Sequence, residues 1–237
     1  MKELIRTGLD RLNLSPSVPE NAAELLEHYG QALIEKNKVM NLTAITEPKD
    51  VATLHMLDCA PLLDCARLEG KTLIDVGTGA GFPGMVLKIL VPSLNVTLLD
   101  SLQKRLDWLD EVAADLSLTG VRTIHGRAEE AGQDPALREQ FDFATARAVA
   151  DLRLLCEMCL PFVRVGGRFL AMKSTECNGE LEYSSSAIET LGGKLVGCYD
   201  YAIPFTDVTH RVAVIEKISK TPVKYPRRWA KMQKEPL

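Results

Sequence analysis

The residues with the clearest chemical signature are those of the segment Asp75–Gly84, DVGTGAGFPG, which contains four glycines. The segment follows a short apolar run that predicts a β-strand and precedes a run that predicts a helix. Glycines allow a left-handed backbone and let a ligand approach the main chain without a Cβ in the way. A ligand at such an elbow meets unpaired N–H groups and the positive end of a helix. We therefore predict a ligand-binding loop, with Gly79 and Gly81 among its binding residues.

Two classes of ligand fit this loop. The spacing Gly79-x-Gly81-x-x-Gly84, with Asp100 about 20 residues further on, matches the dinucleotide-binding pattern. An acid followed by x-Gly-x-Gly-x-Gly is instead typical of S-adenosylmethionine-dependent methyltransferases, and Asp75 suits a cationic ligand better than a pyrophosphate. There is also no second domain of dehydrogenase size to hold a substrate. A methyltransferase is therefore the first hypothesis, and a dinucleotide-dependent oxidoreductase or a non-catalytic nucleotide-binding module is the last.

Strands that alternate with helices must position the loop. Short apolar or β-branched runs predict strands over 71–76, 95–100, 121–125, 141–146, 167–172, 196–203 and 212–217, with helices such as 82–90 and 102–118 between them. The last two strands have no helix between them, so they must pair antiparallel. The sequence thus predicts an α/β, doubly wound, mostly parallel sheet with ligands at the carboxyl ends of the strands. Asp100, which ends the second strand, is then a candidate ribose ligand, although it could also cap the next helix.

The residues before the first strand read as helical. Apolar positions at helical spacing predict one helix around Leu4–Leu12, a second around Leu25–Ile34 and a third over Pro48–Ala66. His55 and Asp58 share one face of the third helix, which favours a local hydrogen bond over a catalytic pair. The expected organisation is an N-terminal helical region over 1–68, a methyltransferase domain over 69–220 and a basic tail over 221–237.

Composition narrows the class of protein further. Charged residues are 25% and hydrophobic residues 46% of the 237, which excludes wholesale disorder. No apolar run reaches the roughly 18 residues of a membrane span, and charges interrupt the first twelve residues, so we expect a cytoplasmic protein without a membrane contact.

We interpret the six cysteines as thiols. Cys156-x-x-Cys159 has no second cysteine pair or nearby histidine, so no metal site is predicted.

The charge is distributed unevenly. Residues 221–237 carry five Lys or Arg against one acid, a charge of +4, so the remainder must carry −8 to give the net −4. A basic tail on an acidic body is compatible with a polyanionic partner. It could also be only a solubilising terminus, but Tyr225 and Trp229 interleaved with the cations favour contact with RNA. The candidate RNA-binding residues are Lys224, Arg227, Arg228 and Lys231.

A set of motifs in fixed order resembles one family. The motifs are NKVMNLTAI (37–45), HMLD (55–58), DVGTGAGFPG (75–84), LLDSLQKR (98–105), GRAEE (126–130), ARAVA (146–150), GGRFLAMK (166–173) and TPVKYPRR (221–228). Together they resemble the bacterial 16S ribosomal RNA guanine-N7 methyltransferases, also called glucose-inhibited division protein B. The resemblance runs from Asn37 to the C-terminus. After Arg228 this chain reads WAKMQKEPL, where relatives usually keep a Gly and a Pro.

The resemblance implies a fold and a site. It implies a class I S-adenosylmethionine-dependent methyltransferase, with a Rossmann-like, seven-stranded sheet, an antiparallel C-terminal strand pair and an N-terminal helical cap. S-Adenosyl-L-methionine is the implied cofactor. The implied residues that contact it or line its site are Gly77, Phe82, Asp100, Ala128, Glu129 and Arg147. The candidate cofactor set also includes Asp75, Gly79 and Gly81 of the loop and Ser101 and Leu102, which follow Asp100.

The implied reaction is methyl transfer to N7 of a guanine in the decoding-region loop of 16S rRNA. Guanine N7 has a lone pair and no proton, so the attack needs no general base, and we nominate none. Arg147 and Glu129 are the candidates for holding the guanine edge or the cofactor. The implied partner is 16S rRNA or the small ribosomal subunit, and we expect a monomer. The alternative is a methyltransferase that acts on another RNA, a protein or a small molecule.

Overall fold

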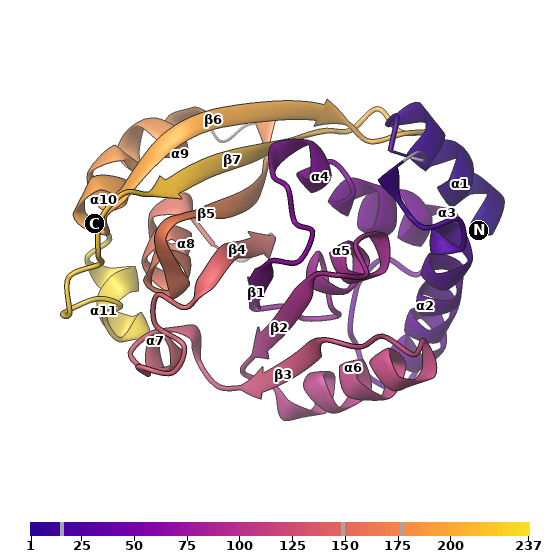
Figure 1. Cartoon of the computed structure of the whole chain (residues 1–237), viewed down its shortest axis with the longest axis horizontal. Coiled ribbons are helices and arrows are strands. Elements are labelled where there is room, and N and C mark those ends of the chain that lie inside the picture. Colours follow the sequence, from indigo (N-terminus) through magenta and orange to yellow (C-terminus); the bar gives the residue numbers. More distant parts are fainter. Residues whose placement is uncertain (15–16, 148–149, 176–177) are drawn as a thin grey trace.

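The computed structural model describes residues 1–14, 17–147, 150–175 and 178–237 (Figure 1). Its helices are α1 (Lys2–Arg11), α2 (Ala22–Asn37), α3 (Pro48–Asp50), the π-helix η2 (Val51–Leu57), α4 (Leu62–Cys65), α5 (Gly84–Leu90), α6 (Gln103–Asp115), α7 (Ala128–Ala131), α8 (Leu152–Cys159), the 3-10 helix η3 (Leu160–Phe162), α9 (Asn178–Tyr183), α10 (Ser185–Thr190) and α11 (Trp229–Lys234). Its strands are β1 (Thr72–Val76), β2 (Asn95–Asp100), β3 (Val121–His125), β4 (Phe141–Arg147), β5 (Val163–Ser174), β6 (Gly193–Ala202) and β7 (Thr209–Lys217).

The strands form one twisted sheet in the order β3-β2-β1-β4-β5-β7-β6. The first five strands along the chain are parallel to one another, whereas β7 runs antiparallel to both of its neighbours, β5 and β6. This confirms the predicted sheet, including its antiparallel C-terminal pair. The order reverses at β1, where the next strands along the chain lie on opposite sides, so a ligand crevice is expected at the carboxyl end of β1.

The strand boundaries agree with the sequence pattern where both ends are marked by turn residues. β2 and β3 begin and end as predicted, whereas β5 extends beyond the predicted 167–172 at both ends, and β6 begins before the predicted 196–203 and ends one residue earlier. The residues that β6 gains at its start and those that β5 gains at its end pair with β7, and such long-range pairing leaves no local signal. The single helix predicted over Pro48–Ala66 was wrong: the chain forms α3, η2 and then α4, whose N-cap is Pro61. A proline has no N–H to continue the preceding helix.

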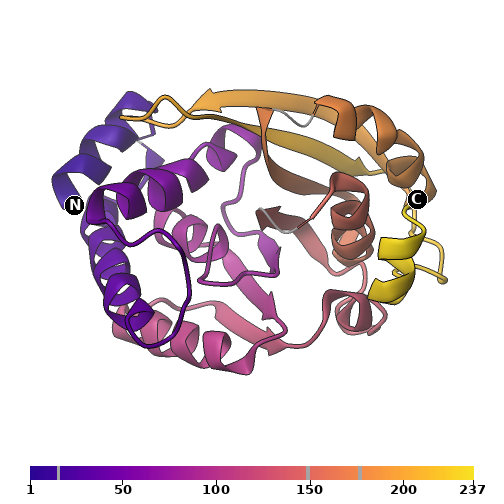
Figure 2. The ribbon, with the colours of Figure 1, turned by 180° about the vertical axis from the view of Figure 1, so that it is seen from behind.

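Two hydrophobic cores lie on the two faces of the sheet because successive strand residues point to opposite faces. One core packs α1, α2, η2, α5 and α6 against residues such as Leu73 and Leu98. The other packs α8, α10 and the C-terminal segment against residues such as Ile74 and Leu99. Figures 1 and 2 show the N-terminal helices at one end of the molecule and α11, beside α7, at the other. Among the described residues no helix is long and apolar enough to cross a membrane.

Candidate cofactor site

A cavity of about 140 Å³ lies at the carboxyl ends of β1, β2 and β3. Several predicted residues line it together, although they lie at or after the ends of three different strands: Gly77, Asp100, Ser101, Ala128 and Glu129. The other predicted cofactor residues lie outside this lining: Asp75, Gly79, Gly81, Phe82, Leu102 and Arg147. The remaining lining residues are Val76, Leu99, Gly126, Arg127, Met158 and Trp229. The cavity is therefore at the expected edge of the sheet, but its far wall comes from the C-terminal half of the chain.

Asp100 shapes the cavity as well as lining it. Its Oδ2 accepts a hydrogen bond from the Gly79 N–H at 2.8 Å, and its Oδ1 accepts one from the Leu102 N–H at 2.9 Å. The carboxylate thus fixes the glycine loop and the turn before α6, but it does not cap that helix, whose N-cap is Leu102 and which has no side-chain cap. Each carboxylate oxygen has further lone pairs, and these remain available to hydroxyl donors in the cavity. Arg105 Nη1 also lies 3.4 Å from Oδ2.

Asp75 is a buried carboxyl at the centre of the loop. Its Oδ2 accepts hydrogen bonds from the Thr78 hydroxyl at 2.6 Å and from the Gly84 N–H at 2.9 Å. Its Oδ1 is buried and has no hydrogen-bond partner in the described part of the chain. Burial raises the pKa of this carboxyl to about 6. An unsatisfied, buried carboxylate oxygen is stabilised by a nearby cation or donor, which fits a positively charged ligand.

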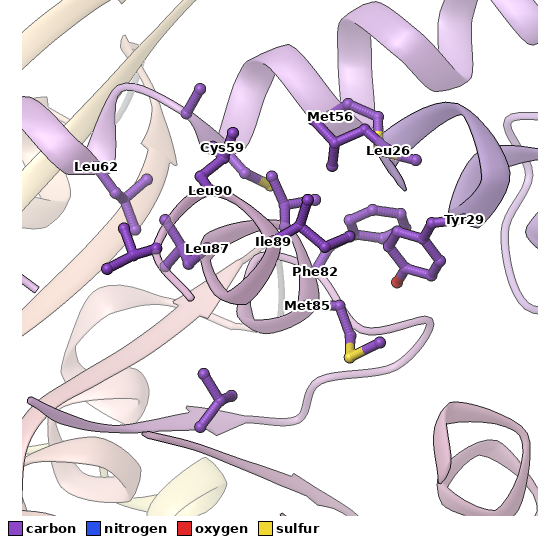
Figure 3. Close-up of a cluster of buried hydrophobic side chains, with 14 of the residues drawn as sticks. Leu26, Tyr29, Met56, Cys59, Leu62, Phe82, Met85, Leu87, Ile89 and Leu90 are labelled. Atoms are coloured by element: carbon purple, nitrogen blue, oxygen red, sulfur yellow. The ribbon is translucent and has the colours of Figure 1, made fainter. Parts of the chain in front are cut away.

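Helices α2, α5 and α6 pack against the glycine loop. Gly81 has φ +91°, and a Cβ there would come within 2.7 Å of Leu109 and 2.8 Å of Met85. Gly81 is thus required for close packing, whereas a Cβ on Gly79 (φ +58°) would meet only the Gly77 carbonyl oxygen, at an ordinary contact distance of 3.9 Å. Tyr29 of α2 donates a hydrogen bond to the Ala80 carbonyl, and its ring lies 5.3 Å from that of Phe82 (Figure 3). Phe82 is therefore a packing residue between the loop and α2.

Arg147, at the end of β4, uses its guanidinium to bind residues of the N-terminal region. Its Nη2 lies 2.8 Å from His55 Nδ1, and its Nη1 donates to the Leu54 carbonyl at 3.0 Å. Because a guanidinium can only donate, His55 Nδ1 must accept, so the neutral ring carries its proton on Nε2 and donates to the Thr43 hydroxyl at 2.8 Å. Burial and the Arg147 charge lower the pKa of His55 to about 3.

Asp58 connects this network to the last two strands. Its Oδ2 is 3.2 Å from Arg147 Nη1. Its Oδ1 accepts from the Tyr201 hydroxyl at 2.9 Å and lies 2.7 Å from His210 Nδ1. The carboxylate is 1% exposed, and its hydrogen bond raises the pKa of His210. His55 and Asp58 thus meet through Arg147, rather than through the predicted local bond, and they tie η2 to β4, β6 and β7.

The predicted RNA-binding residues divide into two groups. Lys224, Arg228 and Lys231 are exposed. Arg227 instead forms a two-pronged ion pair with Glu157 of α8, whose side chain is 1% exposed. Tyr225 is only 5% exposed and belongs to the core beside α8, so its ring is not available to stack on RNA. The segment is therefore anchored to the protein, with three cations on its outer side.

A second cavity, of about 870 Å³, opens beside the first. The two share Arg127, Glu129 and Trp229 as lining residues. Sequence reasoning missed Gly126 and Arg127, although they directly follow β3 and the rule that ligands lie at strand ends could have found them. No local sequence pattern indicated that Met158 would line the cavity. The sequence predicts Trp229 only as an RNA contact, whereas the structure places it in the lining of both cavities.

Cysteine chemistry plays no part in this site. Cys59, Cys65, Cys156 and Cys159 are free thiols, as expected, and Cys177 lies outside the described residues. Burial raises the pKa of the Cys156 and Cys159 thiols, which keeps them protonated. No group of three or more His, Cys, Asp or Glu within the described ranges is placed to hold a metal ion.

The sheet order and the cavity at the ends of β1–β3 define a class I S-adenosylmethionine-dependent methyltransferase. Solved structures share this fold. M. jannaschii TYW2 in complex with AdoMet is 15% identical, with a TM-score of 0.53 over 68% of this chain and 75% of that one. Precorrin-6y C5,15-methyltransferase from Geobacter metallireducens GS-15 is 13% identical, with a TM-score of 0.51 over 76% of this chain and 92% of that one.

The chain belongs to the rRNA small subunit methyltransferase G family, whose model matches residues 22–200. It is 47% identical to the ribosomal RNA small subunit methyltransferase G of Alkaliphilus metalliredigens (strain QYMF), over 100% of this chain and 98% of that protein. It is 46% identical to the protein of the same name from Alkaliphilus oremlandii (strain OhILAs), over 100% of this chain and 99% of that one. These findings confirm the resemblance and exclude the oxidoreductase hypothesis.

Proposed function

We propose that this protein transfers a methyl group from S-adenosylmethionine to N7 of a guanine in 16S rRNA, within the decoding-region loop of the small subunit. Membership of the methyltransferase G family supports rRNA as the substrate. The observation that carries the cofactor assignment is the cavity in which Gly77, Asp100 and Ala128 meet at three strand ends. The protein then acts in the cytoplasm, where ribosomal subunits are assembled, and works as a monomer.

The residues present fit the cofactor, which combines an ammonium, a sulfonium, a ribose diol and a purine. Asp100 would accept hydrogen bonds from the ribose hydroxyls, which its free lone pairs permit. Ala128 and Glu129, at the end of β3, would bind the purine edge. Gly77 would allow close approach of the main chain. Asp75, with its unpartnered buried oxygen, supplies negative potential close to the cationic end.

The methyl-transfer step requires correct orientation of the two reactants and no proton transfer. Bound S-adenosylmethionine supplies an electrophilic methyl group on a cationic sulfur. The guanine N7 lone pair forms the new C–N bond as the C–S bond breaks, so the positive charge moves to the purine and no proton is transferred in the step. The side chains therefore act by orienting the two reactants and excluding water. Arg147 acts in this proposal as a positioning residue, because it holds the Leu54–Asp58 segment against the end of β4.

The proposal is tested by labelling. Purified protein is incubated with radiolabelled S-adenosylmethionine and small subunits that lack the modification, and the label is mapped on the RNA. We expect label at N7 of one guanine in 16S rRNA. Naked rRNA and intact ribosomes run in parallel establish which assembly state is the substrate. An absence of label on all three, from protein that still binds S-adenosylhomocysteine, would reject the rRNA assignment and favour another methyl acceptor.

A further inference from the structure

The C-terminal segment reaches back to the cofactor cavity. Trp229, the first residue of α11, lines the small cavity together with Gly77 and Asp100, although more than 120 residues separate it from them in the chain. The same side chain lines the larger neighbouring cavity. Trp229 thus stands where the two cavities adjoin.

This position is fixed by the rest of the segment. Arg227 pairs with buried Glu157 at 2.7 and 2.8 Å, next to Met158, which also lines the small cavity. Gln133 donates to the Pro226 carbonyl at 3.0 Å, and Met232 of α11 is fully buried. The indole is therefore carried by a docked segment with contacts on both sides of it, and not by a free tail.

The small cavity is smaller than the pockets that usually hold small molecules. Pockets that hold small molecules usually measure about 300–1,000 Å³. The small cavity, at about 140 Å³, lies below that range, so a ligand bound at Gly77 and Asp100 extends beyond it. The larger cavity adjoins it, and Trp229, Arg127 and Glu129 line both, so a ligand part that extends in that direction lies beside them.

The flat, apolar indole of Trp229 suits one part of S-adenosylmethionine better than the others. Trp229 offers a flat aromatic face, and Met158 adds an apolar, polarisable side chain to the same cavity. The purine is the flat aromatic part of S-adenosylmethionine, whereas its amino-acid end is charged. We propose that Trp229 is a cofactor-binding residue that packs on the purine, and that the Arg227–Glu157 ion pair positions it. This inference rests on the proposed function and adds a residue to its cofactor site.

Tryptophan fluorescence and calorimetry test the assignment on the full chain. The protein has two tryptophans, Trp108 and Trp229, so Trp108→Phe makes Trp229 the sole reporter. We expect S-adenosylhomocysteine to change its fluorescence saturably, with the Kd that calorimetry gives for the same protein. Trp229→Ala should weaken S-adenosylhomocysteine binding about tenfold, as expected for loss of an aromatic–base contact, and Trp229→Phe should retain most of the affinity. Gln233→Ala, exposed on the same helix, is the matched control and should bind as the wild type does.

The outcomes separate the two assignments. If the wild type does not bind S-adenosylhomocysteine, the cofactor assignment itself fails, and this inference with it. If the wild type binds, but Trp229→Ala binds equally well and the reporter does not respond, only the role of Trp229 is overturned. An unchanged affinity with slower rRNA methylation would likewise overturn it and assign the indole to the RNA. If Trp229→Ala does not fold, the fluorescence of the Trp108→Phe protein decides.

Discussion

The guanidinium of Arg227 and the carboxylate of Glu157 form a two-pronged ion pair, with Nη2–Oε2 at 2.7 Å and Nε–Oε1 at 2.8 Å. The backbone N–H of Arg227 donates to the same Oε1 at 2.8 Å. Their side chains are 14% and 1% exposed, so the pair is largely removed from water. It joins the C-terminal segment to α8, one residue from Met158 in the cavity wall.

Breaking this pair should destabilise the protein and weaken cofactor binding together. Arg227→Gln leaves Glu157 as a buried charge with an incomplete set of partners, which costs about 3–5 kcal/mol in comparable buried pairs. The free energy of unfolding, measured in urea, should fall by that order. Binding of S-adenosylhomocysteine should weaken as well, because Trp229 is no longer held in place.

A charge-matched control and a double variant complete this test. Lys234→Gln removes an exposed cation from the same segment and should change stability by less than about 0.5 kcal/mol. Replacing both partners with apolar residues, Arg227→Met with Glu157→Leu, should recover most of the lost stability, since no buried charge remains. Equal stability of Arg227→Gln and the wild type would show that the pair does not anchor the segment.

Asp100 should be the side chain on which cofactor affinity depends most. Asp100→Ala removes the acceptors proposed for the ribose hydroxyls and the two bonds to the Gly79 and Leu102 N–H groups. Hydrogen bonds to charged groups contribute about 1.5–3 kcal/mol each, so affinity for S-adenosylhomocysteine should fall at least about tenfold by calorimetry. Asp115→Ala, which removes an exposed carboxylate, serves as the control. Unaltered affinity in Asp100→Ala would exclude the ribose role.

Local sequence signals were sufficient for the parallel part of the sheet and for the residues at its edge. The runs that end at Val76, Asp100 and His125 are short, apolar or β-branched and bounded by turn residues, so their carboxyl ends could be placed. Once these strands are parallel neighbours, the residues that follow them must share one edge. Asp100 and the glycine loop after Val76 were predictable for that reason, whereas Ala128 was implied only by the resemblance to the family.

The contacts that complete the site depend on pairings distant in sequence. Arg147 meets His55 across 92 positions, and Arg227 meets Glu157 across 70. Nothing in the local pattern distinguishes an arginine that will be buried beside a carboxylate from one that will face RNA. The charge of the C-terminal segment predicted a role in recognition, but only its packing against α8 shows that Trp229 points to the cavity and Tyr225 to the core.

The buried imidazole of His55 should make stability depend on pH. Its pKa is about 3 in the folded protein, against 6.5 for an unperturbed histidine. Between these values the unfolded chain binds a proton that the folded protein does not, so the free energy of unfolding should decrease as pH falls from about 6.5 towards 3. His55→Gln cannot titrate, and its amide can still accept from Arg147 and donate to Thr43.

The measurement is the difference in unfolding free energy between wild type and His55→Gln across this pH range. The wild type should lose up to about 4 kcal/mol relative to the variant as the pH falls. His28→Gln is the control, since that imidazole is 53% exposed in a surface ion pair. Parallel curves for wild type and His55→Gln would mean that His55 is protonated in the folded protein as readily as in the unfolded chain.

The exposed cations of the C-terminal segment should contribute to RNA binding without affecting the cofactor. Lys224, Arg228 and Lys231 face outward, whereas Arg227 is held by Glu157. Each cation that neutralises a phosphate releases about 0.7–0.9 counterions, so changing all three to Gln should reduce the slope of log affinity for 16S rRNA against log salt by about 2–3. S-Adenosylhomocysteine should bind as before. Lys194→Gln, an exposed cation on β6, is the control, and an unchanged salt slope in the triple variant would remove this segment from the RNA-binding surface.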